Sequence, residues 1–147
     1  MSTNKVPAAQ FELGHQFKAR EARDHFKDVL DAAESRVAVV RRADPIVALD
    51  RAVLDVLLSD HAPLAVKSSV TAGQIAFWLE DGPVHATGND LDSAEDAFLD
   101  ALVDYAELWF VELKFAPNHA RHQFLALRIA AFAGDRSELH DMVFGDD

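Results

Sequence analysis

The spacing of apolar residues between residues 18 and 59 constrains the fold more than any other feature of the sequence. Apolar residues recur at helical spacing over Ala19–Glu34, including Ala22, Phe26 and Leu30. The period then shortens in two apolar runs, and it lengthens again over Arg51–Ser59. Apolar residues every three to four positions indicate a helix with one buried face, and short apolar runs indicate strands. We therefore expect a helix, two strands at Val37–Arg41 and Ile46–Asp50, and a second helix.

Four short motifs occur in order within this stretch. They are Arg20-Glu21-Ala22-Arg23, Val39-Val40-Arg41-Arg42, the turn Ala43-Asp44, and Pro45-Ile46-Val47-Ala48-Leu49. In this order the motifs resemble the N-terminal domain of the Phd/YefM antitoxins of bacterial toxin–antitoxin pairs. The resemblance implies a β-α-β-β-α domain over residues 1–62, with a first strand near Phe11–Phe17 that pairs with the hairpin. It also implies that the sheet belongs to an intertwined homodimer.

The same resemblance assigns DNA contacts to basic residues of this domain. The family's contacts fall on Arg23 and on Arg41, with Arg42 beside it, and we expect Arg20 and Lys27 to add phosphate contacts. Arginine suits this role because its planar guanidinium donates two hydrogen bonds to guanine edges or to phosphate. Without the resemblance, the favoured interpretation would be that Arg41 and Arg42 are a solvated strand end and that Arg23 belongs to an ion pair on the helix surface, because surface arginines are common.

The second half of the sequence has the pattern of a folded α+β domain, residues 63–147. Gln74–Leu79 and Val84–Thr87 flank an Asp-Gly turn, which is typical of a β-hairpin. A long helix should follow up to about Phe115, capped by Asp90 or Asp92, with two more helices at Asn118–Ala133 and after Asp135. The buried stripe of the long helix should consist of Ala94, Phe98, Leu102, Tyr105, Trp109 and Leu113. We expect the boundary between the domains in Pro63–Ala72.

This second half resembles the C-terminal half of actinobacterial members of the same antitoxin family and, more distantly, the HicB-type antitoxin fold. The resemblance rests mainly on Gly88, Leu91, Ala94 and the following helix. It implies an α+β protein whose Phd/YefM-like domain is followed by a hairpin and three helices.

Charge divides the chain unevenly. Lys and Arg number 14 against 25 Asp and Glu, yet residues 1–62 carry nine against ten and residues 63–147 carry five against fifteen. One face of the long helix gathers acidic residues, namely Glu95, Asp96, Asp100, Asp104 and Glu107. They form either a solvated helix face or a docking surface for a basic protein, such as a toxin that needs a positive surface to act on RNA.

Several classes of protein are excluded or disfavoured. The sequence has no cysteine and none of the glycine-rich, nucleophile or metalloprotease motifs of common enzymes, so we expect no enzymatic activity and no cofactor. His119 and His122 lie one turn apart, but no third metal ligand stands at motif spacing, so we expect no metal. The N-terminus does not resemble a signal peptide and no apolar run is long enough to span a membrane, which predicts a cytoplasmic protein.

The sequence therefore predicts an antitoxin that binds a cognate toxin encoded by a neighbouring gene and represses its own operon as a homodimer or larger assembly on operator DNA. Two alternatives stay open. One is a stand-alone transcriptional regulator whose second half senses a small molecule or mediates assembly, which would require an apolar pocket there. The other is an interaction module that no longer binds DNA, which would fit Val40 and Ala43-Asp44, where many family members have threonine and a glycine-containing turn.

Overall fold

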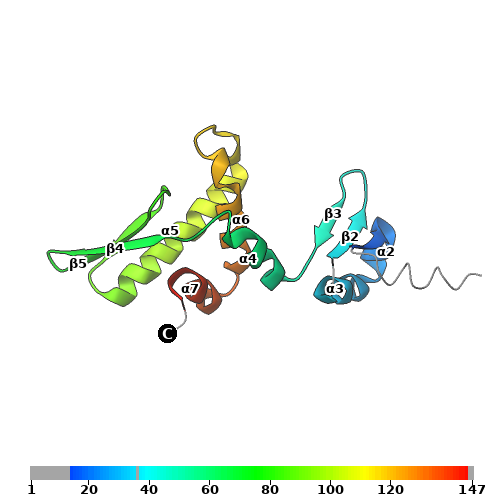
Figure 1. Ribbon diagram of the computed structural model, residues 1–147, viewed down its shortest axis with the longest axis horizontal. Coiled ribbons are helices and arrows are strands. Elements are labelled where there is room, and N and C mark those ends of the chain that lie inside the picture. Colours follow the sequence, from blue (N-terminus) through cyan, green and yellow to red (C-terminus); the bar gives the residue numbers. More distant parts are fainter. Residues whose placement is uncertain (1–13, 36, 146–147) are drawn as a thin grey trace, which may run out of the picture. The chain divides into compact units, whose positions relative to one another are not determined.

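The structure is a computed structural model that describes residues 14–35 and 37–145 (Figure 1). It is a mixed α+β structure with two three-stranded sheets and six α-helices in the described part of the chain. The chain divides between Leu54 and Asp55 into two compact units. No helix among the described residues is long and apolar enough to cross a membrane.

The first unit is built on a sheet of order β1-β2-β3, with strands β1 (Gly14–Lys18), β2 (Val37–Arg41) and β3 (Ile46–Ala48). β1 runs parallel to β2, and β3 runs antiparallel to β2. The expected strand at Phe11–Phe17 and its pairing with the hairpin are therefore confirmed over residues 14–17, whereas residues 11–13 lie outside the described chain. Helices α2 (Ala19–Asp24) and α3 (Phe26–Ser35) connect the parallel strands β1 and β2.

The expected single helix over Ala19–Glu34 is wrong in one respect, because it is interrupted at His25. This residue has φ −130° and ψ 55°, so it separates α2 from α3. The interruption changes which side chains face the sheet: Val29 is buried, while Phe26 and Leu30 are exposed. No glycine or proline marks the break, so the periodicity of the sequence did not reveal it.

A small core joins these helices to one face of the sheet. It consists of Phe17, Ala22, Val29, Ala33 and Ala38. The strands were expected to be covered on both faces or buried in a dimer seam, yet Ile46 and Val47 of β3 are exposed in the single chain. Helix α4 (Arg51–Ser59) follows with the expected bounds, and the division between the units falls inside it.

The second unit holds an antiparallel sheet of order β4-β5-β6, formed by β4 (Val66–Thr71), β5 (Gln74–Leu79) and β6 (His85–Gly88). The expected hairpin of β5 and β6 is confirmed. Residues 66–71, expected to lie at a domain boundary, instead form β4. Ala72 (φ 53°) and Gly73 (φ 80°) make the tight turn that pairs β4 with β5. Two positive φ angles suit such a two-residue turn, but alanine is not among its usual residues.

The long helix α5 (Leu91–Val111) packs on this sheet and supplies more of the second core than any other element. Its predicted stripe is buried except Leu113, which follows the helix in the 3₁₀ turn η1 (Leu113–Phe115) and is half-buried. Asp90 caps the helix: its carboxylate accepts the Ser93 backbone N–H at 2.8 Å, and the Ser93 hydroxyl accepts the Asp90 N–H at 3.3 Å. These hydrogen bonds lower the pKa of Asp90. Of the two expected caps, Asp90 is therefore the one that the helix uses.

Two further helices complete the second unit. α6 (Gln123–Phe132) is preceded by a short 3₁₀ turn, η2 (Ala120–His122), so the expected helix from Asn118 begins later than predicted. α7 (Arg136–Phe144) begins after Asp135, whose side chain accepts the Glu138 N–H at 3.0 Å. Both helices pack on the core around α5 through buried side chains, namely Leu125 and Ile129 of α6 and Leu139 of α7.

The second unit begins eight residues before the expected boundary at residue 63. Arg128 of α6 explains the difference, because its Nε contacts the Asp55 carboxylate at 2.7 Å and its Nη1 donates to the Ala62 carbonyl at 2.9 Å. Ala62 itself is buried in the second core. Residues 55–62 are thus held to the second unit by contacts with residues far away in the sequence.

Candidate functional site

A basic surface forms where β1 and β2 end in the first unit. Lys18 and Arg41 are paired in register at the ends of these parallel strands, so their side chains leave the same face of the sheet. The Arg41 guanidinium also donates to the Gln16 side chain at 3.4 Å. Arg42 follows directly and is exposed. Sequence reasoning named Arg41 and Arg42 but missed Lys18, whose signal was its position as the last residue before the first helix.

The predicted arginines of α2 are also exposed, but each lies near an acid. Arg20 Nε is 3.8 Å from the Asp24 carboxylate, and Arg23 Nε is 3.3 Å from the same carboxylate. Exposed ion pairs of this kind contribute little to stability and exchange readily with solvent or ligand. Both guanidinium groups are therefore available to a phosphate that competes with Asp24.

Lys27 lies on α3 and pairs with Asp31 at 2.7 Å. The hydrogen bond that Lys27 donates to the Asp31 carboxylate, and the negative charge of that carboxylate, raise the pKa of Lys27, so this ammonium stays charged over the physiological range. The interruption at His25 separates Lys27 from α2, which carries Arg20 and Arg23.

A groove of about 460 Å³ lies beside the basic surface. It is lined by Gln16, Phe17, Lys18, Glu21 and Arg41. The Glu21 carboxylate accepts the Lys18 backbone N–H at 3.2 Å, which fixes the start of α2 against the end of β1. The start of α2 thus lies beside Arg41, and α2 carries Arg20 and Arg23.

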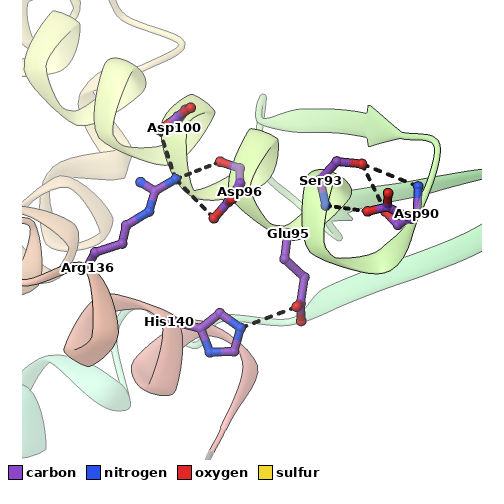
Figure 2. Close-up of polar contacts among 7 residues, drawn as sticks. All are labelled: Asp90, Ser93, Glu95, Asp96, Asp100, Arg136 and His140. Atoms are coloured by element: carbon purple, nitrogen blue, oxygen red, sulfur yellow. Dashed lines mark hydrogen bonds and ion pairs between the residues drawn. The ribbon is translucent and has the colours of Figure 1, made fainter.

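The acidic face of α5 divides into two parts. The Arg136 guanidinium of α7 lies 2.9 Å from the Asp100 carboxylate and 3.7 Å from that of Asp96, and His140 Nε2 lies 3.4 Å from the Glu95 carboxylate. Figure 2 shows these contacts between α7 and α5. Three of the five predicted docking residues are therefore already engaged within the chain. In the described chain, neither Asp104 nor Glu107 takes part in an ion pair, and both are exposed.

A tyrosine between two histidines was not expected from the sequence. The Tyr105 hydroxyl lies 3.0 Å from His119 Nδ1 and 2.6 Å from His122 Nδ1. A hydroxyl donates only one hydrogen bond, so with both imidazoles neutral one Nδ1 accepts and the other is protonated and donates. Trp109 adds a bond from its indole N–H to the His119 carbonyl at 2.8 Å, which holds the turn before α6 against α5.

Burial adjusts the acid–base properties of this cluster. It raises the pKa of Tyr105, an effect that Arg121 opposes. It also lowers the pKa of His122, and the nearby positive charges of Arg121 and His119 lower it further. Both shifts favour the neutral forms of Tyr105 and His122.

His119 and His122 have the spacing of two metal ligands one helical turn apart. In the structure the Nδ1 atom of each imidazole faces the Tyr105 hydroxyl. Within the described ranges, no group of three or more His, Asp or Glu side chains is placed to hold a metal ion.

A cavity of about 340 Å³ opens beside this cluster in the second unit. Its lining combines apolar side chains with charged ones: His61, Ala62, Pro63, Ala65, Leu79, Glu80, Asp81, Gly82, Arg121, His122 and Leu125. The His61 ring packs on Phe124 with 5.1 Å between centroids. The cavity is large enough for a small organic molecule with both polar and apolar groups.

Comparison with known proteins gives one informative match. No family model matches the sequence, and no curated protein matches it. The fold is similar to the crystal structure of the antitoxin part of a proposed toxin–antitoxin system from Syntrophomonas wolfei subsp. wolfei, with a TM-score of 0.61. The two sequences are 18% identical, and the match covers 87% of this chain and 95% of that chain. The shared fold therefore extends over residues of both units.

Proposed function

We propose that this chain is an antitoxin that binds and neutralises a toxin encoded by a neighbouring gene. The observation that carries the proposal is the fold likeness to an antitoxin over 87% of the chain. The order of the four motifs in residues 20–49 supports an antitoxin of Phd/YefM type. Its action would be binding rather than catalysis.

We further propose that the first unit binds operator DNA and so represses the antitoxin's own operon. The exposed cations Lys18, Arg20, Arg23, Arg41 and Arg42 support this role, with Lys27 as an additional phosphate contact. Several cations on one surface provide the sequence-independent part of DNA affinity, and arginine can add contacts with base edges. Exposed Phe26, Leu30, Ile46 and Val47 supply apolar area for a second copy, so a homodimer would meet a pseudo-palindromic operator.

The second unit would hold the toxin, since the net negative charge of the chain lies in this unit. A basic toxin surface would be attracted to it and covered by it. If one toxin contacts two antitoxin dimers, toxin binding and DNA binding reinforce each other by linkage. Repression would then be strongest when antitoxin and toxin are both present.

Co-expression with each adjacent open reading frame tests the proposal. We expect one neighbour to arrest growth when expressed alone, and the full-length chain to restore growth and to co-purify with that product. If no neighbour is toxic and none co-purifies, the antitoxin function is wrong. A promoter fragment from the same locus provides the second test. A repressor must bind this fragment and slow its migration in a gel, whereas an interaction module that does not bind DNA would leave its migration unchanged.

The cavity in the second unit supports a second candidate function, a stand-alone transcriptional regulator that senses a small molecule. Its volume of about 340 Å³ suits a small ligand, and Arg121, His122 and Glu80 offer both donors and acceptors. This regulator would bind the same promoter DNA but have no toxic neighbour. In a thermal-shift screen of a metabolite panel, at least one compound would then raise the melting temperature of the protein. A Leu125→Trp variant, whose larger side chain fills the cavity, would abolish this increase.

A further inference from the structure

The geometry points to an exposed apolar patch at the C-terminal end of α5 as the docking surface for a basic partner protein. The patch consists of Leu108, Val111 and Phe115, and an acidic rim of Asp104, Glu107 and Glu112 surrounds it. We call these six residues the α5 end surface. This inference rests on the proposed function, which it refines by naming where the toxin docks and what the toxin must present.

The apolar patch carries the argument. Leu108 is 46% exposed, Val111 77% and Phe115 78%, so each of these large apolar side chains near the end of α5 faces solvent. Leu108 and Val111 are three positions apart on α5 and therefore lie on one face, opposite Trp109 in the core. Phe115 lies in η1, four residues after Val111, and its side chain is also exposed. Scattered apolar side chains are ordinary on surfaces, but adjacent ones within an acidic rim are typical of an interaction site.

Charge identifies the partner. The carbonyl groups at the C-terminal end of a helix carry a partial negative charge, and cations are the favourable side chains there. α5 has no basic residue in its last turn, and Glu107 and Glu112 lie near that end. The nearest cation in sequence is Lys114, whose Nζ lies 5.1 Å from the Phe115 ring centroid. The free chain thus keeps an unfavourable arrangement that a bound cation would relieve.

The other end of the same helix shows how such a cation binds. Arg136 places its guanidinium on Asp96 and Asp100, where it also donates to the Asp96 carbonyl at 2.9 Å (Figure 2). Asp104 continues this spacing, being four residues after Asp100. The partner should therefore present an arginine or lysine beside apolar side chains, so that the cation reaches the rim while the apolar groups cover Val111 and Phe115.

The first half of the helix face is a poorer docking surface. Its acids already contact Arg136 and His140, and a partner would have to displace both. These two residues lie on α7, which is anchored in the core through Leu139 and Val143. A basic partner can reach Asp104 and Glu107 without displacing any side chain of α7.

A matched pair of valine substitutions tests the inference. Val111→Lys removes an apolar group from the patch and adds a positive charge, while Val70→Lys makes the same change on β4, where Val70 is 71% exposed. Each full-length variant is mixed with the tagged products of the adjacent open reading frames, and dissociation constants are measured at low and high salt. Glu107→Lys, which reverses a rim charge without changing the patch, gives a second and independent variant.

We expect Val111→Lys and Glu107→Lys to weaken binding by about tenfold or more, as for central residues of an interface. Val70→Lys should stay within about twofold of the unmodified chain, because an exposed site outside an interface contributes little. Wild-type binding should weaken as salt rises, since the rim charges attract the partner. Unchanged far-UV circular dichroism shows that each variant remains folded.

The other outcomes separate the inference from the proposed function. If an adjacent product binds Val111→Lys and Glu107→Lys as tightly as the unmodified chain, the docking surface is wrong and the antitoxin function stands. If no adjacent product binds the unmodified chain, both are wrong. If Val111→Lys lowers the molecular mass of the chain measured alone, a second copy occupies the surface and the inference is overturned.

Discussion

The Arg128 guanidinium and the Asp55 carboxylate, 73 positions apart in the sequence, meet at 2.7 Å. The Arg128 side chain is only 12% exposed, and the Asp55 side chain is 29% exposed. With its bond to the Ala62 carbonyl, Arg128 fixes the end of α4 and the following residues against α6. This half-buried pair determines where the second unit begins.

Replacing Arg128 with methionine should therefore destabilise the second unit. The change keeps much of the side-chain volume but leaves the Asp55 carboxylate and the Ala62 carbonyl without this donor. Because both groups are partly shielded from water, we expect a loss of about 2 kcal/mol in the free energy of unfolding. Urea unfolding measures it, with Arg121→Met as the control at an exposed arginine. Equal midpoints for the two variants would show that the pair contributes nothing to stability.

Gly88 should not tolerate a side chain. A Cβ atom built there lies 2.4 Å from the Ala94 nitrogen and 2.7 Å from its Cα, and backbone atoms at the start of α5 cannot move aside as a flexible side chain can. We expect Gly88→Ala to cost about 2 kcal/mol of stability through overpacking. The control is Gly134→Ala, where a Cβ meets nothing within 4 Å, and it should leave the melting temperature unchanged or slightly higher. A melting temperature for Gly88→Ala equal to that of the unmodified chain would contradict the close approach.

The free energy of unfolding should fall as the pH is lowered, because of the depressed pKa of His122. Burial, Arg121 and His119 lower the pKa of His122 in the folded chain, so the unfolded chain binds a proton first, near its ordinary pKa of about 6.5. The stabilisation is present above pH 6.5 and is lost as the pH falls toward the folded value. We expect His122→Gln to weaken the dependence of the urea midpoint on pH between 7 and 5, whereas His85→Gln, at an exposed position, should keep it. Identical slopes for His122→Gln and the unmodified chain would exclude this role.

Lys18 should contribute to DNA affinity as strongly as the predicted arginines. It is in register with Arg41, so a phosphate near one of them lies near the other. On promoter DNA, Lys18→Ala should weaken binding and make the log–log salt slope shallower by about 0.9, the value for one lost phosphate contact. Lys67→Ala, an exposed lysine of the second unit, is the control. Fluorescence anisotropy at several salt concentrations measures both, and a slope that Lys18→Ala leaves unaltered would remove Lys18 from the interface.

Local patterns in the sequence were sufficient for some elements. α4 and β2 have the predicted bounds, because apolar spacing and the flanking residues determine both. The hairpin of β5 and β6 follows from an Asp-Gly turn between apolar runs. The mixed α+β class is confirmed by the structure and by its fold likeness.

Features that depend on contacts between distant residues could not be predicted. Strand β4 could not be recognised in the sequence, because the Ala72-Gly73 turn that follows it includes an alanine, a residue that rarely has a positive φ. The Tyr105 hydroxyl meets His119 only because the turn before α6 folds back on α5. The engagement of Asp100 by Arg136 likewise depends on α7 packing against α5. The sequence predicts an acidic helix face, but it does not reveal which of these acids contact Arg136 and His140.

The placement of Arg136 at one end of α5 affects how a partner approaches the other end. The helix has 21 residues, so it is about 30 Å long, several times the screening length of about 8 Å at physiological ionic strength. The acids near Glu107 therefore attract an approaching cation over a short range, and no cation of α7 opposes them there. For contacts that begin at these acids, added salt would slow association more than it speeds dissociation.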